Sequence, residues 1–161
     1  MFKNKLVVWI VVIIFGAIIS QCTSAKRDGS GEITKSGDLQ VSETRIGDCF
    51  TDLPDVTEEA ADISSVKAIS CNEPHSWQIF HKSSLTLDEY SETAVIDESN
   101  QICDYAIESL IMGLNDLQIN EYRTADLNII QPTSSSWNKG NRAVNCLIGS
   151  DTKIYYSSIL D

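Results

Sequence analysis

Four cysteines, at positions 49, 71, 103 and 146, constrain the fold of this 161-residue chain more than any other feature. An even number of cysteines in an exported chain favours disulfide bonds, because the compartment outside the cytoplasm is oxidising. Four cysteines allow three pairings, and their spacing alone selects none of them. No C-x-x-C motif is present, which argues against a zinc ribbon or a thioredoxin-type redox pair. The interpretation therefore depends on where the chain resides.

The N-terminus has the layout of an export signal. Lys3 and Lys5 form a short basic region, and residues 6–19 follow without a charged side chain. Fourteen residues of helix extend roughly 21 Å, whereas a bilayer core is about 30 Å thick, so the segment is short for a comfortable membrane span. The basic end stays in the cytoplasm, which directs everything after Cys22 outward.

Cys22 stands where a bacterial lipoprotein carries its lipidated cysteine. In the segment IISQC, apolar Ile19 and small Ser20 fit that motif, but Gln21 departs from it because a small residue is usual directly before the cysteine. Three interpretations stay open: residues 1–22 are a signal peptide that ends in lipidation at Cys22, they remain as an N-terminal membrane anchor, or, as the least favoured, the chain is released in a secreted form. The first two place the chain at the cell membrane, facing the extracytoplasmic side, which is the location we expect.

The charge balance limits the possible partners. Without residues 1–21 the chain has 10 basic and 23 acidic residues, a net charge of −13. Such a chain repels nucleic acid, since affinity for phosphate backbones depends on Lys and Arg. No calcium-binding D-x-[DN]-x-[DN]-G loop is present, so we expect the acidic residues to form solvated surface. We expect no metal and no other cofactor.

The length and composition predict one extracytoplasmic domain. Residues 45–161 are close to the commonest domain size. Residues 23–44 are rich in Ser, Thr, Gly and charge and contain few large apolar side chains, so we expect them to be a flexible tether between the membrane and the domain.

Hydrophobic periodicity predicts strands on both sides of one long helix. Apolar side chains at helical spacing, with Ser91 as N-cap and Gly113 at the C-terminal end, predict the helix over 91–112. Residues 127–130 are a short apolar run, and we expect a turn or a single helical turn at 134–139. The predicted strands are 64–70, 77–85, 142–148 and 153–159. This order indicates an α+β fold, with a small antiparallel sheet packed against one long helix.

Cys71 and His75 lie close together in the segment CNEPHSWQIF, which raises the possibility of a metal site or a catalytic pair. A metal site needs further ligands, and His81 is the second and last imidazole of the chain. A thiol nucleophile has to stay reduced, which an oxidising compartment opposes. We therefore expect Cys71 to be half of a disulfide and Asn-Glu-Pro-His to be a turn after the bridged strand.

Four stretches of the chain together resemble the bacterial septum-formation domain family. They are IGDCF (46–50), AISCNEPHSWQIF (68–80), the helix with its internal Cys103, and QPTSSSWNKGNRAVNCLI (131–148). The family pattern has Gly-Asp-Cys-Phe, Cys-x-x-Pro-His, a helical cysteine and Pro-Thr-x-x-x-Trp-x-x-Gly-x-Arg-x-x-x-Cys in this order. Asn141 stands where an acidic residue is common.

The resemblance implies an exported or membrane-anchored actinobacterial protein with a role in septation or envelope growth. It implies no established catalytic activity. It also favours one pairing of the cysteines, Cys49 with Cys71 and Cys103 with Cys146, of which the second would join the long helix to the sheet.

Four further residues have a structural and a functional interpretation. His75 is either a general base or a residue that fixes the turn by a hydrogen bond of its ring, which we favour. Trp137 either stacks on a ligand or covers the edge of the core, and we expect the second. Arg142 either binds an anionic ligand or, as we expect, forms a salt bridge with a local carboxylate. Asp48 fits a turn-stabilising bond to the backbone. His75, Trp137 and Arg142 are thus the candidate contacts for a partner or ligand.

Three functions are compatible with these features. The first, which we favour, is a membrane-tethered non-catalytic module that binds an envelope or division protein, or a wall partner. The second is a small exported hydrolase or metal-dependent enzyme that uses His75 with nearby carboxylates, although the G-x-S-x-G and S-x-x-K motifs of serine hydrolases are absent. The third is a domain that senses a small ligand in a pocket between helix and sheet.

Overall fold

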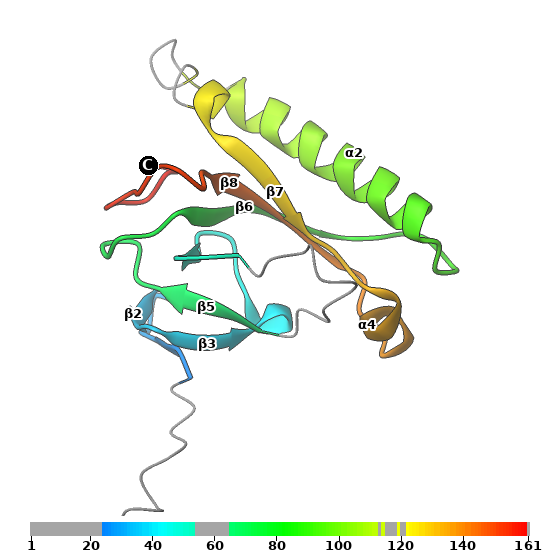
Figure 1. The fold of residues 1–161 in the computed structure, drawn as a ribbon, viewed down its shortest axis with the longest axis horizontal. Coiled ribbons are helices and arrows are strands. Elements are labelled where there is room, and N and C mark those ends of the chain that lie inside the picture. Colours follow the sequence, from blue (N-terminus) through cyan, green and yellow to red (C-terminus); the bar gives the residue numbers. More distant parts are fainter. Residues whose placement is uncertain (1–23, 54–64, 113, 115–118, 120–121, 161) are drawn as a thin grey trace, which may run out of the picture.

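A six-stranded antiparallel sheet with one long helix on one side forms the fold (Figure 1). The structure is a computed structural model and describes residues 24–53, 65–112, 114, 119 and 122–160. The strands follow the spatial order β3-β5-β4-β6-β8-β7, and β1 pairs with β2 in a separate hairpin. The strands are Lys26–Arg27 (β1), Ile33–Lys35 (β2), Gly37–Gln40 (β3), Cys49–Phe50 (β4), Ser65–Ile69 (β5), Trp77–Ser84 (β6), Asp126–Ile130 (β7) and Ala143–Gly149 (β8). The helical elements are Val41–Glu43 (η1), Glu92–Ile111 (α2) and Ser134–Asn138 (α4). The predicted α+β class is confirmed.

The sheet separates two hydrophobic cores, because successive side chains of a strand point to opposite faces. In β8, Val144, Cys146 and Ile148 pack in the core with α2, while Leu147 packs in the other core. The second core is closed by strands that precede β6 in the chain, and its buried members are Ile33, Leu39, Val41, Phe50, Val66, Ala68, Trp77, Ile79, Ile130 and Leu147. Both faces of β6 and β8 are therefore covered, which explains why every residue of β8 from Val144 to Gly149 is buried.

A bulge in β6 allows both cores to be filled. Ile79 pairs with Leu147 and His81 pairs with Cys146, so Phe80 is the extra residue between them. Phe80 packs in the core with α2, whereas Ile79 belongs to the second core. An extra residue of this kind shifts the alternation of a strand and increases its local twist.

Helix α2 begins after Ser91, as predicted, although the Ser91 side chain makes no capping hydrogen bond. The buried residues Val95, Ser99, Cys103 and Ala106 recur every three or four positions and form the face that packs on β6 and β7. The predicted helix end at Gly113 lies outside the described residues.

Two disulfides join elements that are distant in the sequence. Cys49 in β4 is bonded to Cys71 just after β5, with 5.3 Å between the Cα atoms. Cys103 in α2 is bonded to Cys146 in β8, with 5.5 Å between the Cα atoms. The pairing is the one that the family resemblance favours, and both Cα distances are ordinary for disulfides.

The prediction of a flexible tether is wrong for residues 24–44. Strand β3 pairs with β5 along its whole length, from Gly37 opposite Ala68 to Gln40 opposite Ser65. The few large apolar side chains of this segment, Ile33, Leu39 and Val41, are all buried in the second core. Average composition concealed this, since a strand that is covered on one face needs an apolar residue only at every second position.

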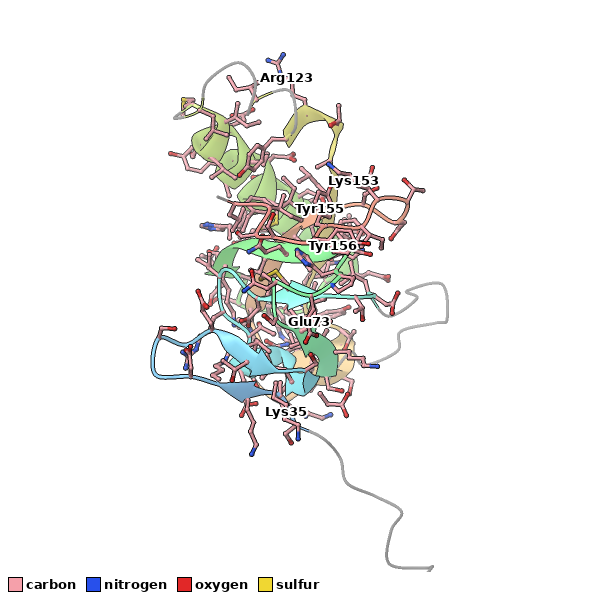
Figure 2. The ribbon with its side chains drawn as sticks, turned by 90° about the vertical axis from the view of Figure 1, so that its left-hand side faces the viewer. Lys35, Glu73, Arg123, Lys153, Tyr155 and Tyr156 are labelled. Carbon is pink, nitrogen blue, oxygen red and sulfur yellow. A yellow bond between two sulfur atoms is a disulfide. The ribbon has the colours of Figure 1, made fainter. Side chains whose placement is uncertain are left out.

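The prediction of a last strand over 153–159 is also wrong. The segment forms a single bridge, in which His75 and Tyr155 exchange two backbone hydrogen bonds. Further along, the Ile159 N–H donates to the side chain of Gln78 instead of to a neighbouring backbone. Hydrogen bonds to a side chain replace the regular ladder that alternation alone predicted. Figure 2 shows Tyr155 and Tyr156 of this segment above Glu73 at the end of the molecule that bears the turn between β5 and β6.

Candidate functional site

Asp48 organises the loop before β4. It is 4% exposed, and its two carboxylate oxygens each accept a hydrogen bond of 2.6 Å from the Arg27 guanidinium. It also accepts a 2.7 Å hydrogen bond from the Arg45 backbone N–H. The predicted turn-stabilising role is thus only part of the observed one, because the ion pair fixes β1 against this loop as well. Bidentate arginine–carboxylate pairs of this kind are both strong and geometrically specific.

The charge of Arg27 is favoured by this pair. Its pKa is raised, first by the hydrogen bond to Asp48 and then, against the effect of burial, by the nearby charges of Asp48 and Glu43. Lys82 lies on the same side and donates from Nζ to the Thr44 carbonyl and hydroxyl oxygens. Partial burial lowers the pKa of Lys82, while the charge of Asp48 partly offsets this effect.

Gln78 connects the same loop to the C-terminal segment. Its Nε2 donates to the Gly47 carbonyl at 3.0 Å and to Ser158 Oγ at 3.1 Å, and its Oε1 accepts from Ile159 N–H at 2.6 Å. Gly47 adopts a φ of +94°, a region that favours glycine, and this conformation turns the loop before Asp48. A buried glutamine in an apolar strand is therefore fully satisfied by hydrogen bonds.

These interactions enclose a pocket of about 420 Å³ beside the first disulfide, which we call the Cys49–Cys71 pocket. It is lined by the β1–β2 turn, the loop before β4, the end of β5 and the C-terminal segment. Its polar and charged lining includes Glu32, Arg45, Asp48, Asn72, Gln78 and Ser158, and its apolar lining includes Ile46, Ile69 and Leu160. A pocket of this size with a few fixed polar groups has the form of a small-molecule or peptide-anchor site.

Arg45 is the cation that this pocket presents. The residue is exposed, and its Nη1 atom lies 2.7 Å from where a side chain on Gly31 would begin. Gly31 has a φ of +97°, so glycine both permits the turn and leaves room for the guanidinium. Among the residues that the structure describes, no carboxylate lies within ion-pair distance of Arg45.

His75, the first predicted contact residue, is completely buried. Its Nδ1 lies 2.9 Å from the Glu73 carbonyl oxygen, which agrees with the expected bond within the turn. Its backbone is bonded to Tyr155 in both directions, and its Nε2 has no hydrogen-bond partner in the described part of the chain. A ring in this position fixes the turn against the C-terminal segment and is shielded from solvent.

Trp137 and Arg142 form a separate cluster at the other end of β8. Trp137 is buried and lies edge-on to Tyr90, and the Arg142 guanidinium carbon lies 3.3 Å from the centre of a Trp137 ring. Arg142 Nη1 donates to the carbonyl oxygens of Trp137 and Asn141, both at 2.9 Å. The expected position of Trp137 at the core edge agrees with this geometry. Among the described residues no carboxylate pairs with Arg142 as expected, and carbonyl oxygens and the indole ring contact its guanidinium instead.

The predicted contact residues are therefore not assembled into one site. Trp77 pairs with Gly149 at one end of the β6–β8 ladder and Ser84 pairs with Ala143 at the other, so His75 and Trp137 lie at opposite ends. A second, more open cavity of about 330 Å³ lies between α2 and β7 and includes Cys103, Asp104 and Leu127 in its lining. It occupies the place where a pocket between helix and sheet was expected.

Sequence reasoning missed Arg45 and Gln78, which line the Cys49–Cys71 pocket, and Arg27, which is paired with the lining residue Asp48. Gln78 carried a signal, since a glutamine between apolar residues of a buried strand requires partners. No sequence signal pointed to Arg27 or Arg45, because their role depends on the folding of the segment before β4, most of which was predicted to be flexible.

Neither a metal cluster nor a membrane-spanning helix is found in the described ranges. Within residues 24–53, 65–112, 114, 119 and 122–160, no three His, Cys, Asp or Glu side chains are close enough together to hold a metal ion. No helix in these ranges is both long and apolar enough to cross a bilayer. The predicted signal or anchor at residues 1–22, with Cys22, lies outside the described residues.

Comparison with known proteins gives one family match. The family model described as septum formation matches residues 26–147, which is most of the chain. The match begins at β1, so the N-terminal strands belong to the same unit as the sheet and helix. No curated protein and no solved structure matches the chain.

Proposed function

This chain belongs to the septum formation family, and from that premise we propose that it is a membrane-tethered extracytoplasmic module that acts by binding an envelope or division partner. Membership of the family supports a role in septum formation, whereas the membrane tether, the binding partner and the absence of catalysis are parts of the proposal. The N-terminal apolar segment with Lys3 and Lys5 supports the membrane location. The two disulfides support exposure to an oxidising compartment.

The observation that carries the proposal is the Cys49–Cys71 pocket. Its buried polar groups are already satisfied: Asp48 is paired with Arg27, and Gln78 is hydrogen-bonded to Gly47, Ser158 and Ile159. Such groups preserve the shape of a site but are poorly suited to accept or release a proton during a reaction. Fixed polar groups beside apolar side chains are suited to the recognition of a ligand or partner.

Photo-crosslinking of the full chain in its membrane tests this proposal. A photoreactive amino acid replaces Ile46, which is 57% exposed at the pocket, and a control protein carries it in place of Tyr105, which is 74% exposed on α2. We expect one envelope or division protein, or a wall fragment, to be captured from position 46 and not from position 105. The same products from both positions, or none from position 46, would contradict the proposal.

The alternative of a hydrolase or metal-dependent enzyme that uses His75 is less well supported. A general base has to reach its substrate directly or through one water molecule, and His75 is 0% exposed. The sensing alternative retains one specific observation, the cavity between α2 and β7. A rise in melting temperature with wall fragments that Leu127→Ala abolishes, while Arg45→Gln does not, would favour it.

A further inference from the structure

Arg45 is the one basic residue that lines the Cys49–Cys71 pocket among the described residues, and Arg27 and Lys82 act on its lining residue Asp48. Arg27 is bonded to Asp48, Arg45 lines the pocket, and the charges of Lys82, Arg27 and Asp48 act on one another. The exported part of the chain has only 10 basic residues against 23 acidic ones. Arg27 and Lys82 thus act on the buried Asp48 carboxylate, whereas the Arg45 side chain lines the pocket itself.

Arg45 is the member of this group that is available to a ligand. Asp48 occupies both terminal nitrogens of Arg27, and Thr44 holds the Lys82 ammonium group. The Asp48 carboxylate meets Arg45 at its backbone N–H, so the Arg45 guanidinium is left to face the pocket without a carboxylate partner in the described part of the chain.

We propose that the Cys49–Cys71 pocket binds an oxyanion, a carboxylate or a phosphate group, carried by a small and partly apolar molecule or by the end of a peptide. The Arg45 guanidinium pairs with the oxyanion, because its planar fork matches the geometry of carboxylate and phosphate oxygens. Ile46, Ile69 and Leu160 contact the apolar part of the ligand. A volume of about 420 Å³ accommodates a molecule of roughly peptide-fragment size.

Glu32 adds selectivity to this site. It is exposed and lines the same pocket, so its negative charge opposes a second anionic group on the ligand. The site therefore favours one oxyanion over a densely charged molecule. This inference rests on the proposed function only in that a binding module needs a ligand site.

Isothermal titration of the full chain in detergent tests the inference with three probes: N-acetyl-dialanine, its C-terminal amide and inorganic phosphate. We expect the free acid to bind, the amide to bind at least about tenfold more weakly, and phosphate to show whether an oxyanion alone is sufficient. Arg45→Gln should weaken binding of the acid at least about tenfold, Arg45→Lys should retain part of it, and Glu32→Gln should strengthen it. Equal binding of acid and amide, or binding that Arg45→Gln does not change, would overturn the inference.

Two controls make each outcome decisive. The melting temperature of Arg45→Gln should match that of the unmodified chain, since the side chain is exposed, and Arg45→Lys provides a second variant if it does not. Crosslinking from position 46 separates the two proposals. If the probes fail but a partner is still captured, the oxyanion site is wrong and the binding function stands; if both fail, both are wrong.

Discussion

Asp48 joins two parts of the chain that lie far apart in sequence. Through Arg27 it holds the β1–β2 hairpin, and through the Arg45 N–H it holds the turn that leads into β4. Both charged groups are largely withdrawn from water, so each depends on the other for stabilisation. At the residue scale this ion pair explains how a polar N-terminal segment becomes ordered, which average composition did not predict.

Removal of Arg27 should therefore destabilise the fold. Arg27→Met leaves Asp48 buried without its ion partner, and we expect the free energy of unfolding to fall by about 3 kcal/mol. Urea unfolding followed by circular dichroism measures this loss. Arg45→Met is the matched control and should change stability by no more than about 0.5 kcal/mol, because its side chain is exposed. Equal effects of the two variants would contradict the role assigned to the pair.

Asp28 should make stability depend on acid pH. Its carboxylate accepts from the Ser30 hydroxyl and from the N–H groups of Ser30, Gly31 and Glu32, and its pKa is lowered, first by the Ser30 hydroxyl. The folded state thus favours the charged form. Its contribution is complete above the unfolded pKa of about 3.9 and is lost as the pH falls through the lower folded pKa.

The melting temperatures of the unmodified chain and of Asp28→Asn, measured from about pH 6 to about pH 2, test this dependence. We expect Asp28→Asn to melt lower at pH 6 and the difference to shrink toward pH 2. Asp104→Asn, which changes an exposed carboxylate on α2, is the control. A difference for Asp28→Asn that stays constant over the whole range would refute the assignment.

At the scale of elements, regular hydrophobic periodicity predicted the helix and the main strands, whereas structure that depends on side-chain hydrogen bonds could not be predicted. The helix after Ser91 and the strands that contain Ala68, Phe80 and Cys146 were expected at nearly their observed positions, because their apolar residues recur at the period of the element. The segment around Tyr155 alternates in the same way, yet it is held by one bridge and by Gln78. Its structure is set by a partner far away in sequence, which a local pattern does not contain.

The candidate site was less predictable than the fold for a related reason. His75, Trp137 and Arg142 were singled out because their residue types are common in functional sites. In the structure, however, His75 contacts a carbonyl oxygen, and Arg142 packs on the Trp137 ring and donates to carbonyl oxygens. The Cys49–Cys71 pocket is built from five separate segments of the chain, one of which contributes Gln78 alone. Only the folded structure brings those segments together.

The close approach of β6 and β8 gives a sharp test at this scale. A Cβ atom on Gly149 would lie 2.0 Å from the Ser76 carbonyl oxygen and 2.9 Å from the Trp77 Cα, both of which are backbone atoms. We expect Gly149→Ala to lower the free energy of unfolding by about 3 kcal/mol or more, since the strands have to separate. Chemical denaturation measures the change. Gly29→Ala, where no atom lies within 4 Å, is the control, and similar losses in both variants would argue against this packing.

The bridge from α2 to β8 should contribute much of the stability of the helix. Cys103 and Cys146 are 43 residues apart in the chain, and the chain-entropy model gives about 4 kcal/mol for a loop of that length. The double variant Cys103→Ala/Cys146→Ala should therefore unfold at a much lower urea concentration. The corresponding variant of the Cys49–Cys71 bridge, with a separation of 22, should lose about 3 kcal/mol and also alter the pocket that this bridge lines. No loss in either variant would mean that the bridges do not constrain the unfolded chain.

At the scale of the whole molecule, the parts agree on one environment. The family match gives a role in septum formation, and the basic and apolar N-terminus and the two bridges support the proposal that the domain works outside the cytoplasm. The β1–β2 hairpin is part of this domain, and β1 begins at Lys26, shortly after the proposed membrane segment in the sequence. The Cys49–Cys71 pocket lies against that hairpin.

The most direct test of this account is the intact mass of the native chain after thiol alkylation, measured before and after reduction. We predict that the cysteines at 49, 71, 103 and 146 are blocked before reduction and that all four react after it, with Cys22 as the one position where a free thiol or an acyl chain is expected. Four reactive thiols in the native protein, or a bound metal ion that protects them, would contradict the extracytoplasmic location and the fold that depends on it.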